Sequence, residues 1–266
     1  PGPVHIDLPK DIMHTTVTEE HREFEPYFDR KEITEHNLVK MELFCNLLEK
    51  SQRPLIIAGH GCVDYDKHVT FMAHKCNIPV TTTLHGLGIF DEYCSKSLHM
   101  LGMHGSAYAN YAVQEADLIL SLGARFDDRI IGTKDGFAPK AREAEKEGRG
   151  GIFQVEIEPT QIAKTIMPTG TFIGDCGEFM NYVIANTGYR SRTEWFKRID
   201  HLKRLYPFNY TKSLHNIKTQ QVIEKISENS ALVTFEIVNL DGLTELSSRA
   251  DILETEKSMQ IITAIK

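Results

Sequence analysis

Four charged residues fall within five positions near the middle of the chain, and together they could hold an anionic or polar ligand: Arg125, Asp127, Asp128 and Arg129. They follow an apolar run over residues 117–122, which is typical of a buried strand in a parallel sheet. Open α/β sheets bind ligands just beyond the carboxyl ends of their strands. The intervening Gly123 allows a close approach of the backbone or a positive φ. The pattern predicts a binding loop, and the alternative is a solvated turn whose charges pair with one another.

Glycine-rich turns follow other apolar runs of the chain. Gly59-His60-Gly61 comes after the apolar run 54–58. A lone G-x-G is weak evidence and is more often a plain turn than a phosphate loop. Here a strand precedes it and a helix is expected at about 64–76, which makes the βαβ unit of a dinucleotide fold. Gly102-Met103-His104-Gly105 forms a second such turn.

Strands and helices alternate about five times along the chain, with polar residues or glycine after each strand. The expected strands are 54–58, 78–82, 117–122, 152–156 and 171–173. The expected helices are about 37–50, 64–76, 106–115, 138–147 and 177–185. This alternation predicts an α/β fold with a doubly wound parallel sheet.

Composition excludes several classes of function. The 266 residues carry a net charge of −7, which offers no basic field for nucleic acid. No apolar run approaches the ~20 residues that a membrane span needs. The five cysteines form no C-x-x-C pair, so we expect neither a zinc site nor a disulfide framework, but buried, inert thiols in a reducing compartment. No metal-binding residues are expected.

Three motifs agree in order and spacing with one known family: GMHG at 102–105, GARFDDR at 123–129 and EGRGG at 147–151. Over roughly residues 1–233 the chain resembles acetolactate synthase (acetohydroxyacid synthase), and most closely the fungal type of catalytic subunit. The resemblance covers the end of the pyrimidine domain, the whole Rossmann-like middle domain and the start of the diphosphate domain.

The resemblance implies a function. Enzymes of this family condense two 2-ketoacids in branched-chain amino acid biosynthesis, using thiamine diphosphate and magnesium. The thiamine cofactor sits between a pyrimidine domain, which supplies an activating glutamate, and a diphosphate domain. FAD lies across the middle domain and has no net redox role. The fungal-type enzyme is mitochondrial, and its partners would be a second copy or a full-length catalytic subunit, with no nucleic acid or membrane involved.

The resemblance also implies an FAD site. Backbone amides of Gly59, His60 and Gly61 would approach the diphosphate. The flavin and ribityl chain would meet Thr83, Leu84, Leu101, Met103, His104 and Gly105. Beneath the cofactor would pass Gly123, Ala124 and Arg125, with Arg125 charged for a phosphate and with Asp127 and Arg129 beside it. The adenosine end would meet Glu156, Ile157, Gly174, Asp175 and Cys176.

Two further residues, Lys10 and Asp128, would lie near the substrate channel. Simpler interpretations remain open: Met103 as core filler, His104 as an ordinary loop histidine, Lys10 as an exposed residue after a strand, and Asp127 with Arg129 as a weak surface pair. The chain departs from the family at His60, where alanine or glutamine is usual, and at His85 and Cys176.

The resemblance divides the chain into three parts. Residues 1–36 would be a remnant of the pyrimidine domain, with a strand at 4–8, plus a polar linker. Residues 37–186 would be the FAD-binding domain. Residues 187–266 would be a helical linker, the start of the diphosphate domain with a helix at 218–228 and a strand at 231–234, and a divergent tail from Phe235 that is expected to pack poorly.

Two other functions were weighed. A non-catalytic nucleotide-binding or scaffold module, paired with a full-length subunit, is the main alternative. An NAD-dependent enzyme is less well supported, because a sirtuin-like domain needs zinc-binding cysteine pairs and a dehydrogenase needs a third glycine after Gly59 and Gly61.

We expect no acetolactate formation from pyruvate by this chain alone, even with thiamine diphosphate, magnesium and FAD supplied. The reason is that no Gly-Asp-Gly motif or activating-glutamate domain is found in the sequence. A colorimetric acetoin assay on the purified chain tests this, and turnover above the enzyme-free background would contradict it.

Overall fold

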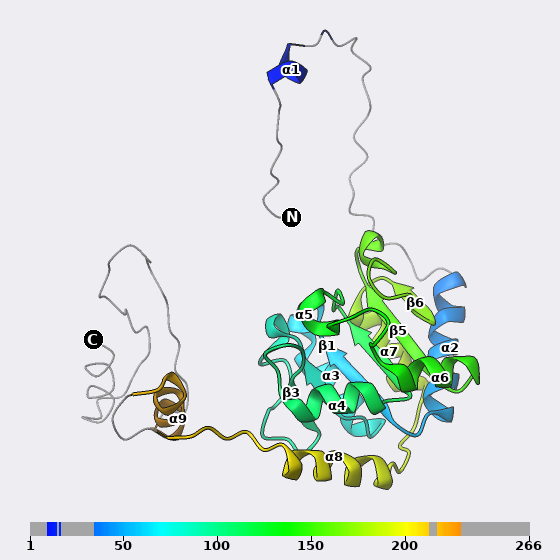
Figure 1. Cartoon of the computed structure of the whole chain (residues 1–266). Coiled ribbons are helices and arrows are strands. Elements are labelled where there is room, and N and C mark those ends of the chain that lie inside the picture. The colour runs from blue at the N-terminus through cyan, green and yellow to red at the C-terminus, as the bar shows by residue number, and fades with distance from the viewer. Residues whose placement is uncertain (1–9, 15, 17–34, 213–216, 230–266) are drawn as a thin grey trace.

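The computed structural model of the chain describes residues 10–14, 16, 35–212 and 217–229. Its centre is a six-stranded, all-parallel sheet with the order β3-β2-β1-β4-β5-β6 (Figure 1). The strands are β1 (Pro54–Ala58), β2 (Val80–Thr82), β3 (Ser97–Met100), β4 (Leu118–Leu122), β5 (Gly151–Glu156) and β6 (Gly170–Ile173). This is the strand order of a Rossmann fold, which confirms the predicted doubly wound parallel sheet.

Helices cover both faces of the sheet. One face carries α2 (Glu35–Lys50), α3 (Asp66–Lys75) and α7 (Cys176–Asn186). The other carries α4 (Ala107–Glu115), α6 (Pro139–Lys146) and α8 (Thr193–Leu205). Shorter helices are α1 (Lys10–Met13), α5 (Asp128–Ile131) and three 3-10 turns, η1 (His60–Tyr65), η2 (Leu84–Gly86) and η3 (Pro159–Gln161). A further helix, α9 (Thr219–Asn229), follows α8 in the chain.

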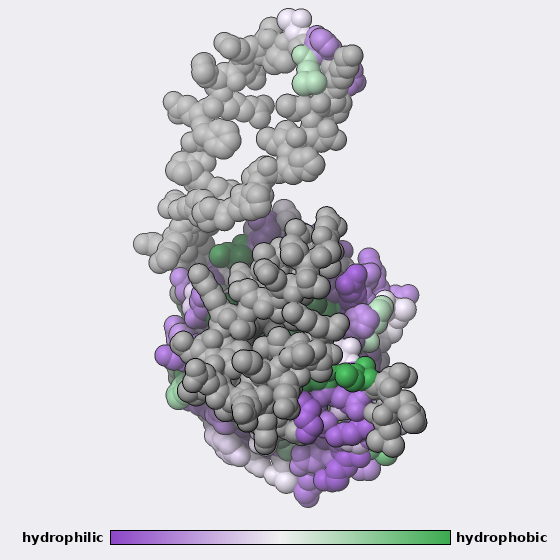
Figure 2. All heavy atoms as spheres, turned by 90° about the vertical axis from the view of Figure 1, so that its left-hand side faces the viewer, coloured by the Kyte–Doolittle hydropathy of each residue, from purple (hydrophilic) through white to green (hydrophobic). Residues whose placement is uncertain are grey.

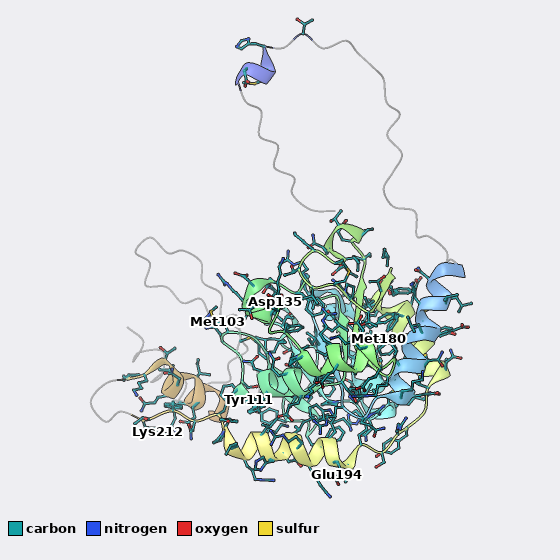
Figure 3. All side chains as sticks on the ribbon, turned by 45° about the vertical axis from the view of Figure 1, so that its right-hand side comes forward. Met103, Tyr111, Asp135, Met180, Glu194 and Lys212 are labelled. Atoms are coloured by element: carbon teal, nitrogen blue, oxygen red, sulfur yellow. The ribbon has the colours of Figure 1, made fainter. Side chains whose placement is uncertain are left out.

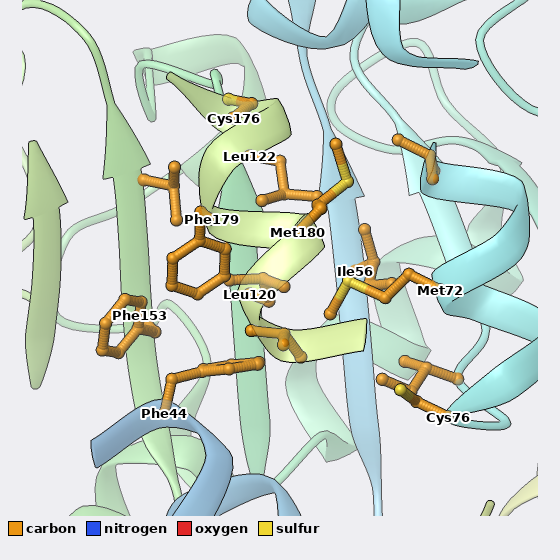
Figure 4. Close-up of a cluster of buried hydrophobic side chains, with 14 of the residues drawn as sticks. Phe44, Ile56, Met72, Cys76, Leu120, Leu122, Phe153, Cys176, Phe179 and Met180 are labelled. Carbon is orange, nitrogen blue, oxygen red and sulfur yellow. The ribbon is translucent and has the colours of Figure 1, made fainter. Parts of the chain in front are cut away.

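Successive residues of the central strands point to opposite faces and so build two cores. In β1, Ile56 joins the core under α2, α3 and α7, whereas Leu55 and Ile57 join the core under α4, α6 and α8. Figure 4 shows the first core, where Phe44 of α2, Phe153 of β5 and Phe179 of α7 meet. The ring centroids of Phe44 and Phe153 lie 5.1 Å apart. Because the strands are buried on both faces, they appear in the sequence as continuous apolar runs.

Buried polar side chains fasten the edge of the sheet where the strands begin. Asp117, just before β4, accepts hydrogen bonds from the amides of Gln52 and Arg53, both at 2.8 Å. Arg192, between α7 and α8, donates to the carbonyl oxygens of Leu48 and Cys76, at the ends of α2 and α3. We call this the amino edge of the sheet.

Helix α8 closes the amino edge from the other side. The indole of Trp195 donates to the carbonyl oxygen of Pro54 at 3.0 Å. Trp195, Ile199 and Leu202 are buried in the second core, while Leu205 at the end of α8 is 55% exposed. Arg198 pairs with Glu115 of α4, and that pairing lowers the pKa of the Glu115 carboxyl.

Most elements lie within two residues of their predicted bounds, but α1, β3 and α5 were not predicted. The region expected as a polar linker, 12–36, contains the start of α2 at Glu35. The predicted strands at 4–8 and 231–234 and the tail from 235 lie outside the described residues. All five cysteines are free, four of them buried, as expected.

The described surface carries many polar and charged side chains. Figure 2 shows polar and charged residues over much of the described area on that side. Among the described helices, none combines the length and the apolar character that crossing a membrane requires.

Candidate functional site

The site is built where the direction of winding reverses. From β1 the chain proceeds to β2 and β3 on one side, and from β4 to β5 and β6 on the other. The connections leaving β1 and β4 therefore diverge, and ligands of open α/β sheets bind in the crevice at such a switch point. Residues 59–61 follow β1 and residues 123–125 follow β4, so the two predicted loops meet there.

Three glycines allow these loops to touch. A Cβ on Gly123 would lie 2.5 Å from the Cα of Gly61, and a Cβ on Gly61 would lie 2.8 Å from the Cα of Gly123. A Cβ on Gly59 would collide with the carbonyl oxygen of Gly123. Gly123 also has a φ of +56°, a conformation that favours glycine. The two turns are therefore in backbone contact, and no larger residues fit without displacing one of them.

The backbone amides of these glycines are used within the protein. Gly59 N donates to Leu122 O at 2.8 Å, Gly61 N to Gly123 O at 3.2 Å and Gly123 N to Val155 O at 2.9 Å. The approach of this turn to a diphosphate stays a prediction. Because the amides of Gly59 and Gly61 join the turn to the neighbouring strand, the exposed side chains around the turn are the clearest donors for an anion.

Arg125 is the best placed of these donors. Its side chain is exposed directly after Gly123 and Ala124. Within the described residues, Arg125, Asp127, Asp128 and Arg129 form no ion pair, so the charges of this loop do not pair with one another as the alternative required. Phe126 has a φ of +52° and a buried ring, which anchors the loop beneath the arginine.

The charged residues after Arg125 form a short helix. Asp127 caps α5, with its carboxylate accepting a hydrogen bond from Ile130 N at 3.2 Å. The carbonyl oxygen of Arg129 accepts a hydrogen bond from Met103 N at 2.8 Å. The GMHG turn and the charged loop are therefore joined, as the resemblance implied by placing both along one ligand.

The GMHG turn is held by a residue that the sequence analysis did not identify. Asn110 of α4 donates to Gly102 O and accepts from Gly102 N, at 2.9 and 2.8 Å. This bidentate bond fixes the turn while Met103 and His104 remain exposed. Met103 is 72% exposed and lies at the periphery in Figure 3, whereas Met180 lies in the interior, so Met103 is not core filler.

Two carboxylates end the last strands, as predicted. Glu156 is buried and accepts a hydrogen bond from Ile157 N at 3.0 Å. Asp175 caps α7 and accepts a 2.6 Å bond from the hydroxyl of Tyr65, which raises the pKa of Tyr65 to about 12. Tyr65 is a second residue that the sequence analysis missed, since no local signal links η1 to α7.

Cys176 does not face outward. Its side chain is buried in the first core, where the Cys62 thiol is its hydrogen-bonding neighbour; that contact and burial raise the pKa of Cys62. Cys62 also donates to Leu122 O. The raised pKa keeps the Cys62 thiol protonated at neutral pH. Both sulfurs are buried and serve packing, so any ligand contact at Cys176 would come from its backbone.

The predicted site residues thus separate by exposure. One group is exposed at the edge of the sheet where the strands end, which we call the carboxyl edge: His60, Gly61, Leu84, Met103, His104, Arg125, Asp127, Asp128, Arg129 and Ile157. Residues that are half-buried or buried beneath them are Gly59, Thr83, Leu101, Gly105, Gly123, Ala124, Glu156, Gly174, Asp175 and Cys176. Lys10 begins α1, and its side chain lies outside the described part.

The switch point, the glycine contacts and the free guanidinium fit an elongated nucleotide laid across the carboxyl edge. The exposed apolar side chains of Leu84, Met103 and Ile157 offer surfaces for rings. Arg125 offers a fixed positive charge for phosphate. In the part of the chain that the structure describes, no group of three or more possible metal ligands is found. Fold and site therefore define a Rossmann-like α/β domain with a candidate nucleotide site at the carboxyl ends of its strands.

Comparison with known proteins places this domain in a family. Residues 41–183 match the family "Thiamine pyrophosphate enzyme, central domain", and the chain belongs to that family. It is 39% identical over 259 residues to "Acetolactate synthase, mitochondrial" of Schizosaccharomyces pombe, covering 91% of this chain and 39% of that protein. It is 40% identical over 245 residues to "Acetolactate synthase catalytic subunit, mitochondrial" of Aspergillus candidus, covering 85% of this chain and 35% of that protein.

A plant relative is somewhat less similar. "Acetolactate synthase 1, chloroplastic" of Zea mays is 34% identical over 251 residues, covering 88% of this chain and 37% of that protein. The higher identity to the two fungal proteins confirms the fungal-like resemblance. The chain spans between 35% and 39% of the length of these relatives.

Proposed function

We propose that this chain provides the flavin-binding central domain of an acetolactate synthase catalytic subunit, the carboligase that condenses 2-ketoacids in branched-chain amino acid biosynthesis. The observation that carries the proposal is the contact of residues 59–61 with Gly123 at the switch point, beside the exposed Arg125, which has no ion-pair partner among the described residues. Its support is the family membership and the names of the relatives.

In the complete enzyme, thiamine diphosphate supplies the carbanion chemistry, and magnesium holds its diphosphate. Neither group is assigned to residues of this domain. The role of the present residues is to bind and orient FAD: Arg125 at the phosphates, Leu84 and Met103 along the flavin side, and Glu156 and Asp175 towards the adenosine end. The names of the fungal relatives, which are mitochondrial catalytic subunits, support a mitochondrial location and a catalytic subunit as the partner.

Flavin titration with two variants tests this placement. Arg125→Ala is expected to weaken FAD binding about tenfold to hundredfold, because it removes a charge-assisted bond worth about 1.5–3 kcal/mol. Asp128→Ala, its matched exposed neighbour, is expected to change the affinity little. The measurement is quenching of flavin fluorescence, with ADP as a competitor for the nucleotide half.

The outcome that would contradict the placement is equally specific. If Arg125→Ala binds FAD as tightly as the unchanged chain, or if Asp128→Ala loses more, the phosphates do not lie at this loop. Circular dichroism of each variant separates a binding effect from loss of the fold, since both side chains are exposed.

A further inference from the structure

Two histidines stand together at the carboxyl edge. His60 opens η1 after β1, and His85 lies in η2 after β2. Their ring centroids are 6.1 Å apart at an interplanar angle of 75°, and both side chains are exposed. The two imidazoles therefore face one space in front of adjacent strands.

The backbone under the pair is rigid. Gly86 packs so closely on the end of β1 that a Cβ there would collide with Ala58 O. Gly86 N donates to Thr83 O at 2.9 Å, and Thr83 N donates to Ala58 O at 3.0 Å. The separation of the histidines is thus set by the pairing of β1 with β2, and only their side-chain torsions remain free.

The amides of the two glycines beside His60 are already bonded within the protein, so the imidazole rings can serve as hydrogen-bond donors to an anion. Gly59 N and Gly61 N, on either side of His60, are bonded to carbonyl oxygens at the end of β4. An anion above η1 would consequently meet the imidazoles of His60 and His85, on the turn whose backbone contacts the loop that carries Arg125. A protonated imidazole carries a positive charge, whereas a glycine amide is neutral. Each ring that gains a proton therefore attracts an anion more strongly.

We propose that His60 and His85 form a pH-dependent clamp for the phosphates of the flavin nucleotide, an inference that rests on the proposed function. Histidine is the side chain whose charge changes between about pH 5 and 8. Both phosphate groups of FAD stay ionised across that range. Because the anion favours the protonated rings, binding takes up protons, and affinity for FAD rises as the pH falls.

The effect of other charged groups around the two turns must be distinguished from the pH dependence that His60 and His85 cause. On η1 and the elements packed against it they are Asp64, Asp66, Lys67, His68, Arg125, Asp175 and Glu178. Carboxylates, lysines and arginines ordinarily keep their charge in this range. His68 of α3, whose ring lies 5.5 Å from that of Tyr65, is a histidine that requires a control of its own. The same holds for His74 in the last turn of α3 and for the exposed His104 of the GMHG turn, and the His74→Gln and His104→Gln variants are each expected to keep the pH dependence.

The test compares FAD affinity at about pH 5.5 and about pH 8, at constant ionic strength, for the unchanged chain and for a His60→Gln/His85→Gln double variant. Glutamine keeps a hydrogen-bond donor but cannot take up the charge. The unchanged chain is expected to bind FAD about tenfold more tightly at the lower pH, and the double variant about equally at both. Riboflavin, which has no phosphate, is expected to show no such dependence.

Two single variants serve as matched controls. His68→Gln, and His201→Gln on the exposed face of α8, are expected to keep the pH dependence of the unchanged chain. An equal pH ratio in the unchanged chain and the double variant, or loss of that ratio in His68→Gln, would overturn the clamp while leaving FAD binding intact. Absence of FAD binding at every pH would overturn the proposed function and the clamp with it.

Discussion

Gly123→Ala is expected to lower the free energy of unfolding by about 2–5 kcal/mol. Two costs add: an alanine held at a φ of +56° is strained by about 1–2 kcal/mol, and its Cβ would stand 2.5 Å from the Cα of Gly61. The neighbour is backbone, so relief requires moving the turn after β1, at a cost of about 1–3 kcal/mol. Urea denaturation measures the change.

Gly148→Ala is the control for Gly123→Ala. Gly148 has a φ of +66°, but a Cβ there would meet nothing within 4 Å. Alanine at 148 is expected to cost only the strain, about 1 kcal/mol. Equal losses for the two variants would show that the contact between the turns contributes nothing to stability.

Arg192→Ala is expected to cost about 3–5 kcal/mol of stability. The Arg192 side chain is buried, and its removal leaves the carbonyl oxygens of Leu48 and Cys76 without this donor at the ends of two helices. Burial lowers the pKa of the guanidinium to about 10, which leaves it charged at neutral pH. Chemical denaturation again gives the measurement.

Arg190→Ala tests whether the effect belongs to the buried site. The Arg190 side chain is exposed, so its loss is expected to change stability by less than about 0.5 kcal/mol. Arg192→Lys, which retains one charge but not the forked donors, should fall between the two. A loss below about 1 kcal/mol in Arg192→Ala would mean that water replaces the guanidinium.

The fold could be predicted because four of its strands, β1, β2, β4 and β5, are buried on both faces. Leu55–Ile57 and Leu118–Leu120 appear as uninterrupted apolar runs, and such runs need no partner to be recognised. Strand β3 has no such run: it is Ser-Leu-His-Met at the sheet edge, with a register shift against β2 and a φ of +57° at His99. An isolated half-buried stretch of this kind carries no periodic signal.

The candidate site was only partly predictable. Loops at strand ends follow from the alternation of elements, so residues 59–61 and 123–125 were expected near one another. Which backbone amides these two loops use to bond to each other depends on the pairing of β1 with β4, and no local sequence pattern indicates that choice. The same holds for the Asn110 bond to Gly102 and for the proximity of His60 to His85. Helix α5 had a local signal, because Asp127 is a favourable N-cap residue, but the charged residues around it favoured the prediction of a loop.

The two edges of the sheet differ in their tolerance of change. At the amino edge, Asp117, Arg192 and Trp195 are buried and hydrogen-bonded across elements distant in sequence, so a substitution there is felt by several helices at once. At the carboxyl edge, His60, His85 and Arg125 are exposed and rest on backbone that other residues fix. Substitutions of single exposed side chains can therefore change what the carboxyl edge binds without lowering the stability that the opposite edge provides.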